Sequence, residues 1–359
     1  MSATLPASPR GAGWPSRTRL MGALALALLS VVAAMAISCA LGPQRISLGE
    51  AFRGVDPDAS ILFGLRLPRA LVACVVGAAL AAAGTALQAL LRNPLAEPFV
   101  LGVSGGAALG GTLVLATAAG LARVAAGAGK LIGAAPPVAV GAVAGAAAAT
   151  LLVFALGRVG GKLVPEAALL VGVVFNAFAA GVISLVKLLL PPEQASRLLY
   201  WLLGSVGYES PGTIAAGATL VALSLGGLVV LSARLNLLTL GEEEAASLGL
   251  DVRRARNAIF FAASAATGAA VALAGMVGFV GLIVPHLVRR AVGPDHRLLV
   301  PASALFGAAF LVLADALARL LFLPLGTEPP VGAVTAFLGG PFFLWLLRRG
   351  ARPEVEGGT

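Results

Sequence analysis

Charged side chains are scarce in this chain. Asp, Glu, Lys and Arg make up 11% of its 359 residues, whereas a soluble domain usually carries about a quarter. Hydrophobic residues make up 59%, and the mean hydropathy is +0.97. A water-soluble fold cannot bury so much apolar surface, because a large part of every globular chain must face water. The composition therefore predicts an integral membrane protein.

Cysteine, histidine and the common nucleotide motif are also rare or missing. The two cysteines, Cys39 and Cys74, lie in apolar stretches, which excludes a disulfide framework and a CxxC metal site. His286 and His296 stand ten positions apart without a third ligand, so we predict structural roles for them. The phosphate-binding pattern GxxxxGK(S/T) does not occur, and neither does HExxH. We therefore predict no enzyme activity, no metal site and no cofactor in this chain.

Long apolar runs, in contrast, are abundant. A spanning helix needs about 20 apolar residues, because about 30 Å of hydrocarbon is covered at 1.5 Å per residue. The chain holds ten such runs, at 20–41, 67–91, 99–119, 134–157, 165–190, 211–232, 255–276, 278–291, 301–321 and 330–347. We predict an all-α integral membrane protein of about ten transmembrane helices. The 46 glycines, for example in the segment from Gly141 to Gly145, predict helix packing through small residues.

The runs form a single predicted domain. Its bounds are 20–349, with a cytoplasmic N-terminal tail at 1–19 and a C-terminal tail at 350–359. The run 20–41 is longer than the core of a secretion signal, about 7–15 residues, so we predict a first spanning helix. The pair 255–276 and 278–291 has two interpretations, because it is either two spans or one span followed by a re-entrant segment.

The basic residues predict the orientation. The net charge of +9 is spread over short loops, whereas nucleic-acid binding needs basic residues clustered on one face, so we predict no nucleic-acid partner. If both termini are cytoplasmic, sixteen of the 25 Lys and Arg residues lie on that side and nine on the other. Cytoplasmic loops carry the excess of basic residues. We therefore predict that both termini face the cytoplasm.

One loop carries a helical signal of its own. The predicted cytoplasmic loop 233–254 contains LGEEEAASLGLD, whose three glutamates suit the positive end of a helix dipole. Gly249 suits the position that follows a helix C-cap. We predict a short helix from Glu242 to Leu248, which is too short to cross a bilayer.

A few polar side chains fall inside the apolar runs, where they are costly. Asp315 lies four residues before Arg319, so both share one helix face. The pair is either an intrahelical ion pair or a place where Arg319 meets a partner at the outer mouth. Gln88 and Asn176 are predicted to make interhelical hydrogen bonds, and pore lining is the alternative.

Four long motifs follow one another along the chain. They are RLPRALVACVVGAALAAAGTALQALLRNPLAEPFVLGVSGG from Arg66, GMVGFVGLIVPHLVRR from Gly275, PDHRLLVPASALFGAAFLVLADALAR from Pro294 and EPPVGAVTAFLGGPFFLWLL from Glu328. Together they closely resemble the signature of the iron-chelate and cobalamin permease family, the transmembrane subunits of type II ABC importers. The resemblance covers nearly everything from residue 45 to 349.

The resemblance implies a ten-helix subunit that pairs with a second permease copy or a paralogue around a central path. It also implies ABC ATPase subunits on the cytoplasmic side and a periplasmic or lipid-anchored substrate-binding protein on the other. The chain itself would make and break no covalent bond. It would lie, surrounded by membrane lipid, in a bacterial cytoplasmic (inner) membrane.

The resemblance further implies three sets of site residues. The outer arginines that form salt bridges to the binding protein correspond to Arg66, Arg69 and Arg319. The inner gate corresponds to Asn93 and Leu95 of the NPLA turn. The short helix that fits a groove on the ATPase corresponds to Glu242, Glu243, Glu244, Ala245, Ala246, Leu248 and Gly249. A second gate element of relatives lies between spans four and five, and no residue of GRVGGKLV matches it.

Without the resemblance, these residues have plainer interpretations. Arg66 and Arg69 are then snorkelling side chains at a helix start, and the segment 242–249 is a solvated loop.

The predicted function is therefore import of a metal chelate driven by a separate ATPase. A ferric siderophore is the first expectation for the cargo, followed by cobalamin and haem. Two other classes stay open. An ion-coupled secondary transporter would need midplane carboxylates and broken helices, and an intramembrane enzyme would need acidic pairs or metal ligands near the interface.

Overall fold

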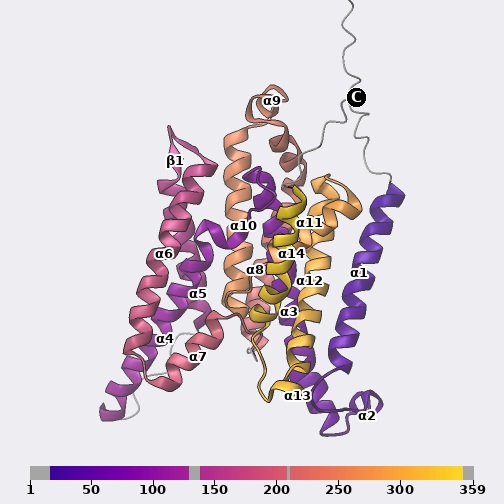
Figure 1. Ribbon diagram of the computed structural model, residues 1–359, viewed down its shortest axis with the longest axis vertical. Helices are drawn as coiled ribbons and strands as arrows, with labels where there is room; N and C mark the ends of the chain where they lie inside the picture. The colour runs from indigo at the N-terminus through magenta and orange to yellow at the C-terminus, as the bar shows by residue number, and fades with distance from the viewer. Residues whose placement is uncertain (1–16, 129–137, 208–210, 351–359) are drawn as a thin grey trace, which may run out of the picture.

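The computed structural model describes residues 17–128, 138–207 and 211–350, which form a bundle of long helices (Figure 1). Ten helices follow the ten predicted runs. They are α1 (Arg17–Ala40), α3 (Leu67–Leu90), α4 (Val103–Ala128), α5 (Val138–Leu156), α6 (Pro165–Leu189), α8 (Pro211–Leu240), α10 (Val252–Ala274), α11 (Val280–Val292), α12 (His296–Leu320) and α14 (Val331–Gly350). The all-α prediction is confirmed. The predicted tails, 1–19 and 350–359, lie almost wholly outside the described residues.

Short elements connect these helices. They are α2 (Leu48–Phe52), the π-helix η1 (Ser60–Arg66), the 3-10 helix η2 (Pro98–Leu101), α7 (Pro192–Leu202), α9 (Glu242–Ser247), α13 (Phe322–Leu325), and the strands β1 (Arg158–Val159) and β2 (Lys162–Leu163). The two strands pair antiparallel between α5 and α6. Gly160 and Gly161 have φ angles of 60° and 80°, which is the conformation that a tight two-residue hairpin turn requires.

The passage after α10 is only partly helical. α10 ends at Ala274, and residues 275–279 are not helical before α11 begins. The 13 residues of α11 rise about 20 Å, less than the hydrocarbon thickness of about 30 Å. The backbone N–H of Phe279, whose φ is 67°, donates to Glu97 Oε1 at 2.5 Å. The uncertain pair of runs is therefore one full helix and a return passage that is helical only in its second part.

Small residues bring the helices into close contact, as the composition predicts. A Cβ atom at Gly145 of α5 would lie 2.1 Å from the carbonyl oxygen of Gly106 in α4. One at Gly84 of α3 would lie 2.0 Å from the carbonyl oxygen of Gly281 in α11. These backbones touch without intervening side chains, which is how membrane helices gain packing where lipid removes the hydrophobic drive.

Adding a side chain at the α3–α11 contact is expected to destabilise the fold. In Gly84→Val the new Cβ meets backbone atoms that have no rotamer to change, and overpacking typically costs about 1–3 kcal/mol or more. The matched control is Gly181→Val on α6, where an added Cβ meets nothing within 4 Å. The measurement is the thermal midpoint of the purified protein in detergent. Equal midpoints for the two variants would contradict the close contact.

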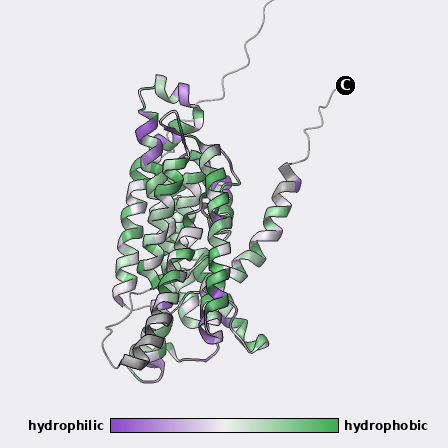
Figure 2. Cartoon of the chain, turned by 90° about the vertical axis from the view of Figure 1, so that its left-hand side faces the viewer, coloured by the Kyte–Doolittle hydropathy of each residue, from purple (hydrophilic) through white to green (hydrophobic). Residues whose placement is uncertain are grey.

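The outer surface of the bundle is apolar. Figure 2 shows hydrophobic colouring along the helices and hydrophilic colouring concentrated at their ends. Among the described residues, seven helices are long and apolar enough to cross a membrane, and Val103–Thr117 and Val331–Trp345 are shorter apolar stretches. Together with α11, these account for the ten predicted passages.

The two ends of the bundle carry different elements. The hairpin β1–β2, α9, the start of α1 and the end of α14 lie at one end, which we term the α9 end (Figure 1). α2 and α13 lie at the other, which we term the α13 end. Because the number of passages is even, the start of α1 and the end of α14 lie at the same end of the bundle.

Candidate functional site

A buried ion pair joins α3 to α12 near the α13 end. The Nη2 atom of Arg69 lies 2.8 Å from Asp315 Oδ1, and its Nε lies 3.0 Å from the same oxygen. Asp315 is 0% exposed. Arg69 also donates to Glu328, in the segment before α14. One guanidinium therefore holds three separate parts of the chain, in the bidentate geometry that arginine favours with carboxylates.

Two more arginines fix the end of α1 to the same place. Arg319 Nε lies 3.3 Å from Asp315 Oδ2, and its Nη2 donates to Ser38 Oγ at 2.6 Å. Arg66 donates to the carbonyl oxygens of Cys39 and Ala40, at 2.8 and 3.0 Å, and to that of Gln44. The last carbonyls of a helix have no intrahelical partner, and a cation there is favourable. Of the two interpretations of the Asp315 and Arg319 spacing, the intrahelical ion pair is present, and the role of Arg319 in meeting a partner stays a prediction.

The three predicted docking arginines thus belong to one group with two acids. We term Arg66, Arg69, Arg319, Asp315 and Glu328 the arginine cluster. Its formal charge is one positive unit, because it holds three arginines and two carboxylates; Arg69 and Arg319 contact the carboxylates, and Arg66 joins the group through the end of α1. The three arginines are 5%, 8% and 5% exposed, so each already has partners within the chain. Burial of charged groups is tolerated only with such pairing.

Glu328 is the member that the sequence reasoning missed. Its side chain is 36% exposed, whereas that of Asp315 is fully buried. It lines a surface groove of about 340 Å³ together with Tyr200 of α7 and Pro330. The signal was present in the motif EPPVGAVTAFLGG, which begins with this glutamate. Nothing in this motif shows that the carboxylate pairs with an arginine 259 positions away.

The predicted gate residues form a turn at the α9 end. The side-chain Oδ1 of Asn93 accepts from the backbone N–H of Leu95 at 2.9 Å, an Asx turn. Asn93 is exposed and Leu95 is half-buried. Arg92, with φ of 48°, donates from Nε to the carbonyl oxygen of Leu238 at 3.2 Å. The turn is therefore tied to the last residues of α8, directly before α9.

The predicted short helix is confirmed as α9. It spans Glu242–Ser247, and Leu248 is its C-cap. Gly249 follows with φ of 84°, the left-handed conformation predicted for it. Three of the predicted coupling residues are glutamates in the first turn, and Ala245 is the buried side chain of this helix.

An arginine of α10 meets both α9 and the hairpin. Arg256 Nη2 donates to Glu242 Oε1 at 2.5 Å, and Nη1 donates to the carbonyl oxygen of Leu163 at 2.8 Å. The hydrogen bond from Arg256 lowers the pKa of Glu242, and the positive charges of Arg92 and Lys162 act in the same direction. The sequence reasoning singled out neither the hairpin nor Arg256. The Gly-Gly pair between Val159 and Lys162 was the available signal for the hairpin.

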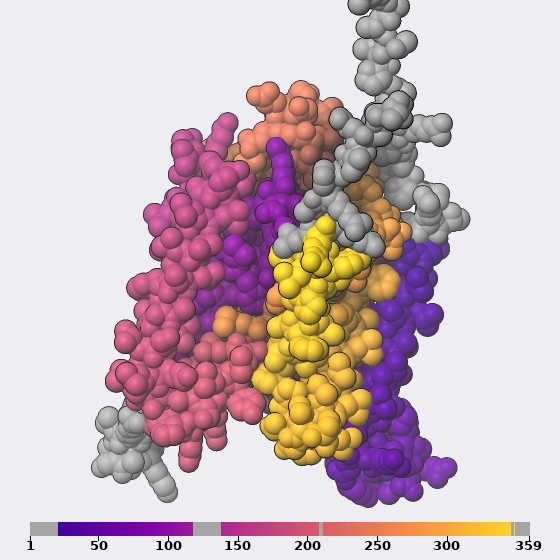
Figure 3. Space-filling view, in the orientation of Figure 1, coloured from indigo at the N-terminus to yellow at the C-terminus, as the bar shows by residue number. Residues whose placement is uncertain are grey.

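One face of the bundle is hollowed. The space-filling view shows a recess between α6 and α14, and a purple segment whose colour places it near residue 90 lies in its upper part (Figure 3). Both helices leave large apolar side chains exposed on the molecule, among them Leu170, Val174, Phe178 and Phe337. The turn that contains Asn93 and Leu95 follows the end of α3 at Leu90 and thus belongs to this segment of the chain.

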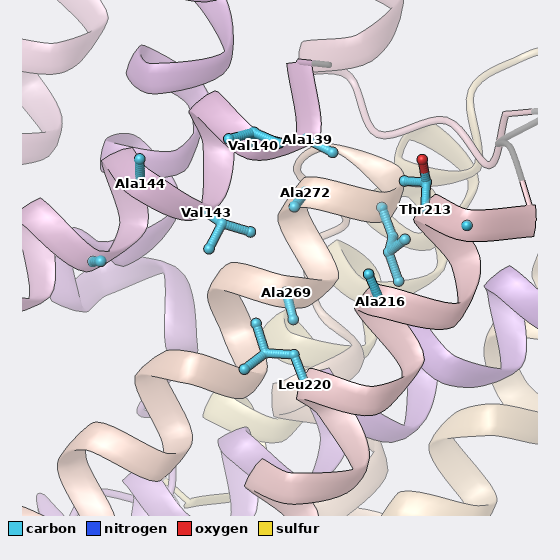
Figure 4. Close-up of a pocket in the computed structure, with 13 residues that line it drawn as sticks. Ala139, Val140, Val143, Ala144, Thr213, Ala216, Leu220, Ala269 and Ala272 are labelled. Carbon is cyan, nitrogen blue, oxygen red and sulfur yellow. The ribbon is translucent and has the colours of Figure 1, made fainter. Parts of the chain in front are cut away.

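A second concavity lies between α5, α8 and α10 (Figure 4). Its volume is about 570 Å³, and Ala139, Val143, Ala216, Leu220 and Ala272 are among the residues that line it. Among the described residues of the lining, Thr213 carries the one hydroxyl and none is charged. This part of the groove has the chemistry of a hydrocarbon contact.

The polar side chains that the sequence singles out within the helices, Gln88 and Asn176, have structural partners. Gln88 donates to the carbonyl oxygen of Gly281 at 3.2 Å, and Asn176 donates to that of Phe99 at 2.8 Å. The predicted interhelical hydrogen bonds are confirmed. His296 lies 2.8 Å from Asn236 Oδ1, and the ring of His286 lies edge-on to Phe342.

Known proteins are similar to this chain in sequence and in fold. The pattern that defines the FecCD transport family matches residues 26–349. The chain is 40% identical over 335 residues to the hemin transport system permease protein HmuU of Yersinia pestis. The aligned region covers 92% of this chain and 96% of that protein. The chain is also 40% identical over 296 residues to the cobalamin import system permease protein BtuC of Halobacterium salinarum, in an alignment that covers 82% of this chain and 75% of that protein. A solved structure described as a metal-chelate type ABC transporter in an inward-facing conformation matches with a TM-score of 0.77 and 30% identity, over 92% of this chain and 99% of that chain.

Proposed function

Because this chain belongs to the FecCD transport family, and is thus the membrane permease subunit of an ABC importer, we propose that it carries a metal chelate inward. The cargo class follows from relatives named for hemin, cobalamin and Fe(3+)-citrate. The single observation that carries the proposal is the family match over nearly the whole helix bundle. The chain is a transport subunit, and a separate ATPase supplies the energy.

The arrangement in the membrane is part of the proposal. The α9 end faces the cytoplasm, where ABC ATPases dock on α9, and both termini lie on that side. Sixteen of 25 basic residues on this side support it. A second copy of the chain, or a paralogue, covers the recess between α6 and α14, and the path for the cargo runs between the two. The exposed turn of Asn93 and Leu95 closes that path at its inner end.

Uptake into proteoliposomes tests the function directly. The chain is reconstituted with its cognate ATPase and binding protein, and labelled haem, cobalamin, ferric citrate and a ferric siderophore are offered with and without ATP. Accumulation of one cargo that requires ATP is expected. A complex that assembles and hydrolyses ATP but accumulates none of them would overturn the cargo class. Failure to assemble with any ABC ATPase would favour the ion-coupled alternative.

The arginine cluster is the proposed docking point of the substrate-binding protein, at the periplasmic side. Carboxylates of that protein approach Arg66, Arg69 and Arg319. They compete with Asp315 and Glu328 for the donors of Arg69 and Arg319, and with backbone carbonyl oxygens for those of Arg66. Glu328 is the partner that a docked carboxylate displaces, because its side chain is 36% exposed and lines the groove beside α7, whereas Asp315 is inaccessible.

Removing the competing carboxylate is therefore expected to strengthen docking. In Glu328→Gln the ion pair with Arg69 becomes a weaker hydrogen bond to a neutral amide oxygen, and the cluster gains a positive unit, so the affinity for the binding protein should rise several-fold, the order expected of an exposed ion pair at about 0.2–1 kcal/mol. The measurement is the Kd of the binding protein for the complex in lipid nanodiscs. Glu193→Gln, an exposed acid on α7, is the control for general charge. Unchanged or weaker binding in Glu328→Gln, relative to Glu193→Gln, would contradict docking at the cluster.

A further inference from the structure

Arg256 is a point at which three elements of the α9 end meet. It projects from the first turns of α10 and is 7% exposed. Its two terminal nitrogens reach different elements, Glu242 at the start of α9 and the carbonyl oxygen of Leu163 in β2. Leu163 is 93 positions away in the sequence. Hydrogen bonds to charged groups are the stronger ones, and the planar guanidinium fixes the directions of both.

The two elements that Arg256 holds are both small, although each also has a buried residue, Ala245 in α9 and Leu163 in β2. α9 has six residues and one buried side chain, and an isolated helix of this length is unstable in water. The hairpin has two residues in each strand, and an isolated two-stranded hairpin is marginal. α10, in contrast, is anchored by buried neighbours of Arg256 such as Ile259 and Phe260. The arginine therefore connects two weak elements to one rigid helix.

Direct packing between α9 and the hairpin does not replace this connection. A cavity of about 450 Å³ separates them, lined by Lys162 and Leu163 on one side and by Glu242, Glu243 and Ala246 on the other. The hydrogen bonds of Arg256 are the ones that link α9 to the hairpin within residues 17–128, 138–207 and 211–350.

We propose that Arg256 is a positioning residue that locks α9, the hairpin β1–β2 and α10 into one unit, so that a displacement of α9 by the ATPase moves the hairpin with it. The inference rests on the proposed role of α9 in ATPase docking. Without the arginine, α9 still binds the ATPase but moves over the cavity instead of carrying the hairpin.

The test compares Arg256→Gln, which removes the charge, with Arg256→Lys and with Glu242→Ala, which removes the acceptor on α9. In the reconstituted complex with ATPase and binding protein, Arg256→Gln should import about tenfold more slowly or worse, the order expected for loss of a hydrogen bond to a charged group, while ATP hydrolysis continues. Arg256→Lys keeps the charge but cannot span both partners in fixed geometry, so its rate should be intermediate. Arg290→Gln, an exposed arginine in the last turn of α11, is the matched control and should import at the wild-type rate.

A distance measurement separates positioning from a general loss of activity. Spin labels are placed at Val159→Cys in the hairpin and Ser247→Cys in α9, after Cys39 and Cys74 are replaced by alanine. The distribution of distances between the two labels should be narrow when Arg256 is present, both without a further change and with Arg290→Gln. It should be broad with Arg256→Gln. If Arg256→Gln does not fold, Glu242→Ala tests the same link, because it removes the acceptor on α9, and should broaden the distribution.

The outcomes distinguish the inference from the function on which it rests. Normal import and a narrow distribution in Arg256→Gln, with import intact in the wild type, would overturn the inference and leave the proposed function standing. No import in the wild-type complex would overturn the proposed function, and the distance distribution would still decide whether Arg256 holds the two elements together.

Discussion

Replacing residues 242–248 with a flexible glycine-serine stretch is expected to reduce ATP-driven import to the level seen without ATP. α9 is the structured segment that the chain presents beyond the end of α8, and the groove of an ATPase can grip a helix but not a flexible loop. A flexible stretch also loses Glu242 and with it the connection to Arg256. ATP hydrolysis by the partner should continue, because its chemistry does not involve this chain. The measurement is the import rate and the hydrolysis rate in the same proteoliposomes.

The control for this replacement changes α9 without dissolving it. Ser247→Ala removes an exposed hydroxyl whose bond is to Glu244 in the same helix, so import should stay near the wild-type rate. A glycine-serine variant that imports as fast as Ser247→Ala would rule α9 out as the coupling element. Loss of import together with loss of ATPase binding would assign α9 to docking, and loss of import with binding retained would assign it to transmission.

The helices could be predicted from the sequence because each depends on a local property. A run such as 165–190 is apolar over more than the thickness of a bilayer, and α6 spans Pro165–Leu189. Gly249 predicted the end of α9 for a similar reason, since only the left-handed conformation that glycine tolerates fits there. Some helix ends were missed, such as the continuation of α8 to Leu240, because the predicted run ended at 232, before Arg234 and Asn236.

The break between α10 and α11 shows the limit of such reasoning. Gly278 and Gly281 at the junction of the two runs indicated an interruption, but the conformation depends on Glu97, which is 182 positions from Phe279. A backbone N–H left free by the break needs an acceptor inside the protein. The sequence alone does not say which carboxylate supplies it.

The sequence and the resemblance predicted which residues form the candidate site, but not most of the residues that they contact. Resemblance selected Arg66, Arg69 and Arg319, and the four-residue spacing paired Arg319 with Asp315 correctly. The contact of Arg69 with Asp315 spans 246 positions, and Arg66 bonds carbonyl oxygens of α1, which have no side-chain signature at all. Burial of these arginines therefore emerged only from the fold. It adds a condition to the docking proposal, because a partner must exchange existing ion pairs instead of meeting free charges.

Breaking the ion pair between Arg69 and Asp315 is expected to be the most destabilising change within the arginine cluster. Arg69→Met leaves Asp315 fully buried with only Arg319 as a partner, and Asp315→Leu leaves three buried arginines with Glu328 as the sole acid. Removing one member of a buried pair typically costs about 3–5 kcal/mol, because an uncompensated charge stays in a low dielectric. The measurement is unfolding of the purified protein in detergent, monitored by the midpoint and by monodispersity. Arg53→Gln, an exposed arginine near α2, should change neither.

The double variant Arg69→Met/Asp315→Leu separates the cost of burying charge from the value of the pair. Replacing both members by apolar groups of similar size is often nearly neutral, so the double variant should be more stable than either single variant, with a coupling energy of about 0.5–3 kcal/mol in the mutant cycle. Additive losses would mean that each residue acts through other contacts, such as Glu328 for Arg69. A stable double variant that no longer binds the substrate-binding protein would assign these charges to docking, and one that still binds would leave Arg66 and Arg319 as the groups that receive the partner.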